Sequence, residues 1–246
     1  MKKMKRLMAG LAAAFILLHL GVFAHGAAQW RGYEPKIGYQ YVQFGTYPTA
    51  KDGAAAPVLW RILGVEDGVA CLMSEYIIDF ITFNDVKDPR DNPLRYQDAV
   101  IFGTINQSIV MELFTDQERA CLLPLAEDRG LLSIPSYLEL RNPDYGFKNH
   151  NFTIDKNRQA FGTPYAHSLG LRKIMRTGQT WYWTTEWRRA GYRWIVGEDG
   201  HISVSGIDRK GGFRPVCNVQ IDLLSISEGD GSFDSPFHAT AAESQP

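Results

Sequence analysis

The chain has 246 residues, a formal net charge of −1 and 45% hydrophobic side chains. A chain of this length can build one domain with a substantial hydrophobic core. Its 26 basic and 27 acidic residues are interspersed along the sequence. This balance argues against nucleic acid as a partner, because nucleic-acid-binding domains concentrate positive charge on one face.

The first 28 residues have the pattern of an export signal. Basic residues near the start precede an apolar run over residues 7–24, and small residues follow at Ala24, Gly26 and Ala27. We therefore predict a signal peptide over residues 1–28 and an exported domain, either periplasmic, cell-surface or secreted. A retained membrane anchor is the alternative, because the apolar run is close to the roughly 20 residues that span a bilayer.

Strands are predicted at the start of the domain that follows, which we place over residues 29–226. Residues 39–45 alternate between apolar and polar side chains, as in a half-buried strand. Two apolar runs over residues 58–65 and 69–74 flank the dipeptide Asp67-Gly68. Because Asp-Gly supplies the positive backbone angles of a tight turn, these runs predict a β-hairpin.

One amphipathic helix is predicted in the middle of the chain, over residues 94–114. Ile101, Ile105 and Ile109 recur four residues apart and form an apolar stripe on one helical face. Gly103 lowers the helix propensity of this segment.

Shorter helices are predicted after it from their capping residues. Thr115 and Glu118 have the spacing of a capping box, in which each side chain hydrogen-bonds the backbone of the other. Hydroxyl residues followed by proline predict short helices over residues 136–141 and 164–175. The aperiodic segment 142–162 between them is predicted to be a long loop of the kind that often carries function.

Four of the six tryptophans lie in the last third of the chain. Strand-like runs over residues 181–187, 192–196 and 202–206 predict an antiparallel meander built around indole rings. Strands at both ends with helices between them favour an α+β fold, in which this block closes a sheet with the early hairpin that carries Trp60. Residues 227–246 are predicted to be a disordered tail, because they show no period that would bury their phenylalanines.

Cys71, Cys121 and Cys217 are the cysteines of the chain. An odd number leaves at least one thiol unpaired. Cys71 and Cys217 lie in strand-like runs, so a disulfide between neighbouring strands and three buried reduced thiols are both consistent with the sequence. No metal-ligand spacing is present, and we predict neither a metal nor a cofactor.

Short motifs along the chain resemble one bacterial family. In order, they are Phe44-Gly45-Thr46-Tyr47-Pro48, Trp60-Arg61-Ile62-Leu63, Leu72-Met73-Ser74-Glu75-Tyr76, Phe114-Thr115-Asp116-Gln117-Glu118, Leu131-Leu132-Ser133-Ile134, Thr163-Pro164-Tyr165-Ala166 and Gly212-Phe213-Arg214-Pro215-Val216. Over residues 38–224 the sequence resembles the bacterial domain of unknown function 6273 family.

The resemblance implies a fold similar to C-type lectins and to the formylglycine-generating enzymes that modify sulfatases. Such a fold has twisted antiparallel sheets, a few short helices and long loops. The family has no established reaction, and this chain departs from its Trp-Trp-Leu-Arg-Ser-Pro block at residues 181–186. Arg214 of this chain resembles the structural arginine in the closing strand of that family.

The residues favour binding over catalysis. A formylglycine-generating oxidase needs paired cysteines near its C-terminus, and only Cys217 lies there. No serine sits in a glycine-flanked nucleophile elbow, and the histidines are scattered singly. The alternatives are an enzyme with a site in the 142–162 loop and a vestigial formylglycine-generating fold.

Exposed aromatic rings can stack on sugar faces, and neighbouring arginines can hold an anionic or planar ligand. We therefore predict an exported domain that binds a small molecule, a glycan or another cell-envelope component. The alternative for the same rings is that they fill the core of the sheet. The predicted ligand-binding residues are Trp183, Trp187, Arg188, Arg189, Arg193 and Trp194.

Overall fold

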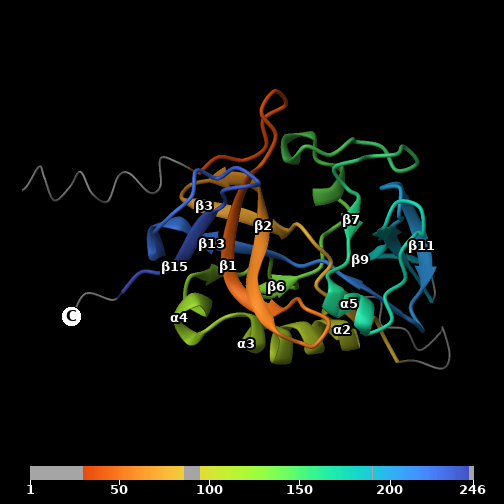
Figure 1. Ribbon diagram of the computed structural model, residues 1–246. Coiled ribbons are helices and arrows are strands. Elements are labelled where there is room, and N and C mark those ends of the chain that lie inside the picture. The colour runs from red at the N-terminus through yellow and green to blue at the C-terminus, as the bar shows by residue number, and fades with distance from the viewer. Residues whose placement is uncertain (1–29, 86–94, 190, 244–246) are drawn as a thin grey trace, which may run out of the picture.

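The computed structural model describes residues 30–85, 95–189 and 191–243. The predicted signal peptide over residues 1–28 lies outside the described residues. The described part has a mixed α+β fold, which consists mostly of curled sheets with a few short helices (Figure 1). None of the helices in these three ranges is both long and apolar enough to cross a membrane.

The larger sheet has eight strands and contains both ends of the described chain. Its path is β14 (Leu224–Ile226), β15 (Phe237–Ala241), β1 (Gln40–Pro48), β2 (Ala55–Glu66), β3 (Val69–Ser74), β13 (Val216–Gln220) and β5 (Leu122–Leu123), with β6 (Leu132–Ser133) also paired to β13. The predicted hairpin is confirmed as β2 and β3. Asp67 and Gly68 form its turn with φ angles of 49° and 77°, in the left-handed region that Asp-Gly tolerates.

The smaller sheet holds the tryptophan-rich block and has five strands. Its order is β11 (Ile202–Gly206), β10 (Tyr192–Val196), β9 (Tyr182–Arg189), β12 (Lys210–Phe213) and β4 (Asp79–Thr82). The predicted meander is confirmed for β9, β10 and β11, which pair antiparallel in sequence order. Strand β12 instead lies on the other side of β9 and runs parallel to it.

The aromatic block therefore does not share a sheet with the Trp60 hairpin, contrary to the prediction. The chain leaves the smaller sheet after Phe213, passes through Arg214 and Pro215, and enters the larger sheet as β13. There β13 pairs antiparallel with β3, with Cys217 opposite Leu72. The first and last parts of the domain do meet in one sheet, but through β13 and not through the indole-bearing strands.

Arg214 lies at this junction between the sheets and is fully buried. Its Nε donates to the carbonyl oxygen of Ser74 at 2.9 Å, and its Nη1 donates to the carbonyl oxygen of Arg158 and the hydroxyl of Tyr182, each at 3.2 Å. Ser74 ends β3 and Tyr182 begins β9, so one guanidinium joins both sheets. The structural role that the resemblance implies for Arg214 agrees with this geometry.

The helix predicted over residues 94–114 is confirmed over residues 100–113, although it is not a regular α-helix. It consists of α2 (Val100–Thr104), a π-helical turn η3 (Ile105–Ile109) and α3 (Val110–Leu113), after a single 3-10 turn η2 (Tyr96–Asp98). The stripe that contains Ile101, Ile105 and Ile109 is buried, as its spacing predicts. Residue 94 lies outside the described residues.

The capping box of the next helix, α4 (Asp116–Arg119), is also confirmed. The Thr115 amide donates to Glu118 Oε2 at 2.9 Å, and the Glu118 amide donates to Thr115 Oγ1 at 3.2 Å. Both bonds join residues that are three positions apart, so the local sequence is sufficient to predict this cap.

Two predicted short helices are shorter in the structure. The helix expected over residues 136–141 is one 3-10 turn, η4 (Glu139–Arg141), which follows Leu138, and the predicted cap Ser133 lies in β6. The helix expected over residues 164–175 is α5 (Pro164–Ser168), which starts at the predicted Thr163 cap. It stops early because Gly170 adopts a φ of 106°, which no helical residue has.

The 142–162 segment is largely loop, as predicted. It contains a 3-10 turn η5 (Pro143–Tyr145) and ends in β7 (Ala160–Phe161), which pairs with β8 (Gln179–Thr180). A last 3-10 turn, η6 (Ile221–Leu223), precedes β14.

The prediction of a disordered tail over residues 227–246 is wrong for residues 227–243. Strand β15 pairs parallel with β1 and antiparallel with β14. Phe237 is 2% exposed, and its ring stacks on Trp30 with centroids 6.0 Å apart. The composition of the tail gave no sign of this, because the partners of Phe237 lie at the other end of the chain. Residues 244–246 lie outside the described residues.

Candidate binding surfaces

Two of the predicted site residues belong to the core. Trp183 is 0% exposed and Arg193 is 1% exposed. The indole nitrogen of Trp183 donates to the carbonyl oxygen of Ile81 at 3.3 Å. The guanidinium of Arg193 lies 5.0 Å from the ring centre of Phe83 and donates to a backbone oxygen of β9. Burial lowers the pKa of Arg193 to about 10. Neither side chain reaches the surface, so neither can contact a ligand there.

Trp187 is 42% exposed but lies on a different face from Trp194. Its partner across the β9–β10 pair is Arg193, and directly opposed residues of an antiparallel pair point to the same face. Arg193 and Trp194 are consecutive in β10, so their side chains point to opposite faces. The structure thus separates the exposed tryptophan of β9 from the partly exposed tryptophan of β10.

Trp194 belongs to a surface stack of two aromatic rings with a guanidinium group at each end. The Trp194 and Tyr137 rings lie with centroids 5.5 Å apart and planes 32° apart. The Arg188 guanidinium carbon lies 5.2 Å from the Trp194 ring centre, and that of Arg141 lies 4.9 Å from the Tyr137 ring centre. We call the four side chains, in the order Arg141, Tyr137, Trp194 and Arg188, the Trp194 stack.

The stack is held in place by the turn that carries Tyr137. The Ser136 amide donates to Glu139 Oε2 at 2.7 Å, and the Glu139 amide donates to Ser136 Oγ at 3.1 Å, which makes a local capping box. The Glu139 carboxylate also pairs with Arg129 at 2.6 Å. This ion pair is partly buried and fixes Glu139, so it stabilises the turn that carries Tyr137.

Two further bonds orient Tyr137 itself. Its backbone amide donates to Glu186 Oε2 at 2.5 Å, which ties the turn to β9. Its hydroxyl donates to Asn151 Oδ1 at 2.8 Å and accepts from Arg141 Nη1 at 2.9 Å. Tyr137 and Arg141 are thus ordered before any ligand arrives.

The stack carries positive charge that the protein does not neutralise locally. Within the described ranges, no carboxylate lies within ion-pair distance of Arg141, Arg188 or Arg189. Arg189 covers the ring of Tyr192, with its guanidinium carbon 4.6 Å from the ring centre. Stacked guanidinium groups keep hydrogen-bond donors free at their edges for a carboxylate or phosphate.

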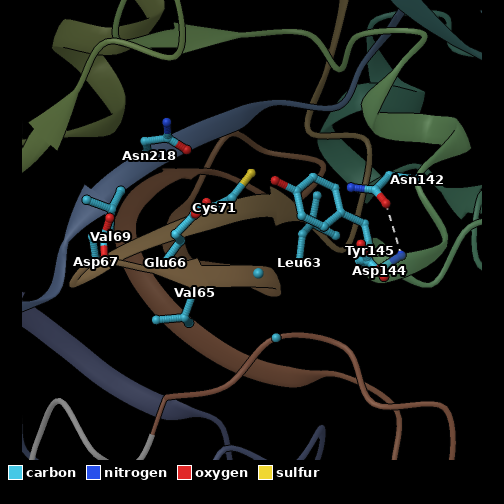
Figure 2. Close-up of a pocket in the computed structure, with 12 residues that line it drawn as sticks. Leu63, Val65, Glu66, Asp67, Val69, Cys71, Asn142, Asp144, Tyr145 and Asn218 are labelled. Atoms are coloured by element: carbon cyan, nitrogen blue, oxygen red, sulfur yellow. Dashed lines mark hydrogen bonds between the residues drawn. The ribbon is translucent and has the colours of Figure 1, made fainter.

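A separate cleft of about 780 Å³ opens at the turn end of the β2–β3 hairpin (Figure 2). Carboxylates, amides and one phenol gather around it. They are Glu66, Asp67, Asp144, Asn142, Asn218 and Tyr145. The first two come from the hairpin, Asn218 from β13, and the rest from the segment around η5. Leu63, Val65 and Val69 give its wall an apolar part.

Close backbone contacts shape this cleft. A β-bulge interrupts the pairing of β2 and β3 between Ile62 and Gly64. The Tyr145 ring lies so near Gly64 that a Cβ atom there would come within 2.8 Å of the ring. Gly32 approaches the other side, where a Cβ would lie 2.7 Å from the Gly64 Cα. Only glycine allows three chain segments to converge at this point.

Cys71 lies at the bottom of the cleft, and Figure 2 shows the Tyr145 hydroxyl pointing toward its sulfur. Burial raises the pKa of the Cys71 thiol to about 12, and it raises the pKa of Tyr145 as well. Both groups are therefore neutral near pH 7. A neutral thiol is a poor nucleophile, so the cleft lacks an activated cysteine.

The three cysteines are all free and buried. Strands β3 and β13 are neighbours, as the sequence suggests, but Cys71 pairs in register with Asn218, while Cys217 pairs with Leu72. Consecutive residues of a strand point to opposite faces, so the thiols of Cys71 and Cys217 lie on opposite sides of the sheet. The disulfide alternative does not fit this register, and the alternative of three reduced thiols does.

In the described ranges, no three histidine, cysteine or acidic side chains gather in a way that could hold a metal ion. The 142–162 loop contributes to both surfaces. Its Asn142, Asp144 and Tyr145 line the cleft, and its Asn151 orients Tyr137 in the stack. Further along it, Asp155 and Arg158 form a buried ion pair at 3.0 Å that holds the loop together.

The protein is an α+β domain that carries the positively charged Trp194 stack and a separate acidic cleft. Comparison of the chain with protein-family models, with curated proteins and with solved structures finds no match. The function must therefore be argued from the two surfaces.

Sequence reasoning found Arg188 and Trp194 but missed Tyr137 and Arg141. The missed residues lie about fifty positions earlier in the chain, just before the loop that the sequence marks as a functional segment. Sequence reasoning also missed the cleft. The glycines and the tyrosine that shape it follow no recognisable pattern in the sequence, and the β2–β3 bulge brings them together only in the folded chain.

Proposed function

We propose that the protein is an exported, non-catalytic domain that binds an acidic glycan or another anionic component of the cell envelope at the Trp194 stack. The observation that carries this proposal is the unneutralised charge of the stack. Arg188 and Arg141 lie over aromatic rings, and within the described residues neither is paired with a carboxylate. A sugar carboxylate or phosphate would supply the missing partner.

The chemistry of the stack suits a polymer of sugars. Aromatic rings present an apolar face to the axial C–H groups of a sugar ring, and guanidinium forks bind carboxylate or phosphate in a bidentate geometry. Arg189 covers the ring of Tyr192 in the same way at the end of the β9–β10 pair.

Export is the second part of the proposal, and it rests on the basic and apolar pattern of residues 1–28. The resemblance of the sequence to the bacterial domain of unknown function 6273 family, and through it to C-type lectins, is consistent with a binding domain and does not bear on the ligand. The α+β architecture is compatible with that relationship.

The test is an array of acidic and neutral bacterial polysaccharides probed with the wild-type protein and with Trp194→Ala and Arg188→Ala. We expect preferential binding to acidic polymers, which weakens as salt concentration rises because the contacts are ionic. Each substitution is expected to weaken binding about tenfold, which corresponds to about 1.4 kcal/mol. Binding should also raise the melting temperature of the wild-type protein.

Trp187→Ala is the matched control, since it removes an exposed tryptophan of the same sheet on the opposite face. It should leave binding unchanged. Equal losses in Trp187→Ala and Trp194→Ala would contradict the assignment of the site. Preference for neutral polymers by the folded wild-type protein would contradict the ligand class.

A further inference from the structure

The cleft at the β2–β3 turn has the opposite electrostatic character from the Trp194 stack. Three carboxylates line it, those of Glu66, Asp67 and Asp144, and no lysine or arginine does. Among the described residues, none of the three forms an ion pair. All three are exposed, and a cleft lined by charges of one sign attracts cations and repels anions.

The cleft also has the size and the mixed lining of a small-molecule site. Its volume of about 780 Å³ lies within the range of ligand pockets, which is roughly 300 to 1,000 Å³. The Tyr145 ring, Val65 and Val69 provide apolar surface. Asn218 adds an amide that can donate and accept, and its side chain makes no hydrogen bond to the described residues. The lining therefore combines an aromatic wall with hydrogen-bonding groups at the rim.

Tyr145 is positioned rigidly enough to serve as this wall. Its carbonyl oxygen accepts a hydrogen bond from the Tyr39 hydroxyl at 2.8 Å. Its ring rests on Gly64, and Asn142 Oδ1 caps the same turn by accepting from the Asp144 amide at 3.0 Å. The Asp144 carboxylate takes no part in that cap, so it is available to a ligand.

We propose that this cleft is a second binding site, specific for a ligand that carries a positively charged amino group beside a sugar ring or a similar apolar face. The carboxylates that line the cleft attract the ammonium group, and the Tyr145 ring packs against the face of the ligand. Asn142 and Asn218 hydrogen-bond its hydroxyl groups. This site goes beyond the function proposed for the stack, since its preferred charge is the opposite one.

One chain segment lines both sites. Tyr137 and Arg141 belong to the stack, and Asn142, Asp144 and Tyr145 belong to the cleft. A hollow of about 420 Å³ borders Arg141 and shares Asn142 and Tyr145 with the cleft. The two sites thus meet along residues 137–145, which places a cation-selective and an anion-selective surface on adjoining parts of one face.

Three sugars that differ mainly in charge test the proposal. They are glucosamine, which is cationic at neutral pH, neutral N-acetylglucosamine and anionic glucuronic acid. Each is titrated into the isotopically labelled protein at pH 7 while its amide resonances are recorded. We expect glucosamine to cause saturable shifts at Gly64, Tyr145 and Asn218, and to bind at least about fivefold more tightly than the neutral sugar. Glucuronic acid should leave these resonances unshifted.

Variants then assign the binding to the cleft. Glu66→Gln and Asp144→Asn remove one charge each while keeping the size of the side chain, and each should weaken glucosamine binding about threefold to fivefold. Glu112→Gln is the matched control, because it removes an exposed carboxylate on α3 and should have no effect. Trp194→Ala should also leave glucosamine binding unchanged, which separates this site from the stack.

The proposal is overturned if the three sugars bind the cleft with equal affinity, or if the cleft variants bind glucosamine as tightly as the wild-type protein does. It is also overturned if the amide resonances of the cleft show no saturable shift when the glucosamine concentration is raised well above the millimolar range. None of these results bears on the polysaccharide binding proposed for the Trp194 stack, which its own variants test.

Discussion

Substitution of Phe237 by alanine tests the part of the fold in which the structure departs furthest from the sequence-based prediction. Phe237 lies in β15, within the segment predicted to be disordered. Its side chain is 2% exposed and stacks on Trp30 with planes 9° apart. Gly231 covers the ring, since a Cβ there would lie 2.6 Å from it, and the Gly231 carbonyl accepts a hydrogen bond from the Tyr41 amide at 2.8 Å.

The expected cost follows from this burial. Truncation of a fully buried phenylalanine to alanine costs about 3 to 5 kcal/mol of unfolding free energy. Strand β15 is near the C-terminus and can relax around the cavity, so we expect about 3 kcal/mol. Phe233 provides the matched control because it is 47% exposed and contacts only the edge of Tyr41, with centroids 5.2 Å apart. Phe233→Ala should cost less than about 1 kcal/mol.

Urea unfolding, followed by tryptophan fluorescence and by circular dichroism, measures both costs. The wild-type and variant curves should have the same slope, so that the shift in midpoint reports stability alone. A disordered tail would make the two phenylalanines equivalent. If Phe237→Ala is no more destabilising than Phe233→Ala, β15 is not part of the folded domain and the reasoning fails.

Three further results are expected. Arg214→Leu should lower the unfolding free energy by about 3 to 5 kcal/mol in urea titrations, because it leaves the Ser74 and Arg158 carbonyl oxygens buried without their donor; wild-type stability would refute the bridging role. Iodoacetamide at pH 8 should leave the thiols of the native protein almost unlabelled by mass spectrometry and label all three in guanidinium chloride, since burial raises the pKa of Cys71 to about 12 and that of Cys217 well above its ordinary value. Rapid labelling of the native protein would show that the thiols are accessible. Burial also raises the pKa of Glu186 above its ordinary value of 4.5, so this carboxyl stabilises the fold most below that pH, and the stabilisation is lost as pH rises through the folded pKa. In thermal unfolding, Glu186→Gln should therefore become more stable relative to wild type as the pH rises from about 4 to about 7. A difference in stability that does not change with pH would show that burial does not disfavour the ionised Glu186 carboxylate.

Local signals in the sequence were sufficient for the turns and caps. Asp67-Gly68 and the Thr115–Glu118 box both act through atoms of residues at most three apart, so no distant partner is needed to define them. The Ile101 stripe was recognisable for the same reason, because helical period is a local property. The α+β class followed from the order of these elements along the chain.

The candidate site shows where local pattern stops being sufficient. Strict alternation would give the aromatic residues of β9 and β10 fixed faces, but the pairing moves from Trp187–Arg193 to Trp183–Ile195. A step of four residues along β9 thus matches a step of two along β10. Trp183 and Trp187 keep the same face, yet Trp183 is buried and Trp187 is 42% exposed, so exposure depends on what packs over each part of the strand. Trp194 is partly exposed and meets Tyr137 from another segment.

The β2–β3 turn, the Thr115 and Thr163 caps, the aromatic meander and the basic residues near Trp194 could be read from the amino-acid sequence. The pairing of strands across the chain, the place of β15 beside β1, and the contribution of residues 137–145 to both the Trp194 stack and the acidic cleft could be seen only in the folded chain. Turns and caps depend on bonds between near neighbours. Strand pairing and side-chain exposure depend instead on surfaces that only long-range packing brings together.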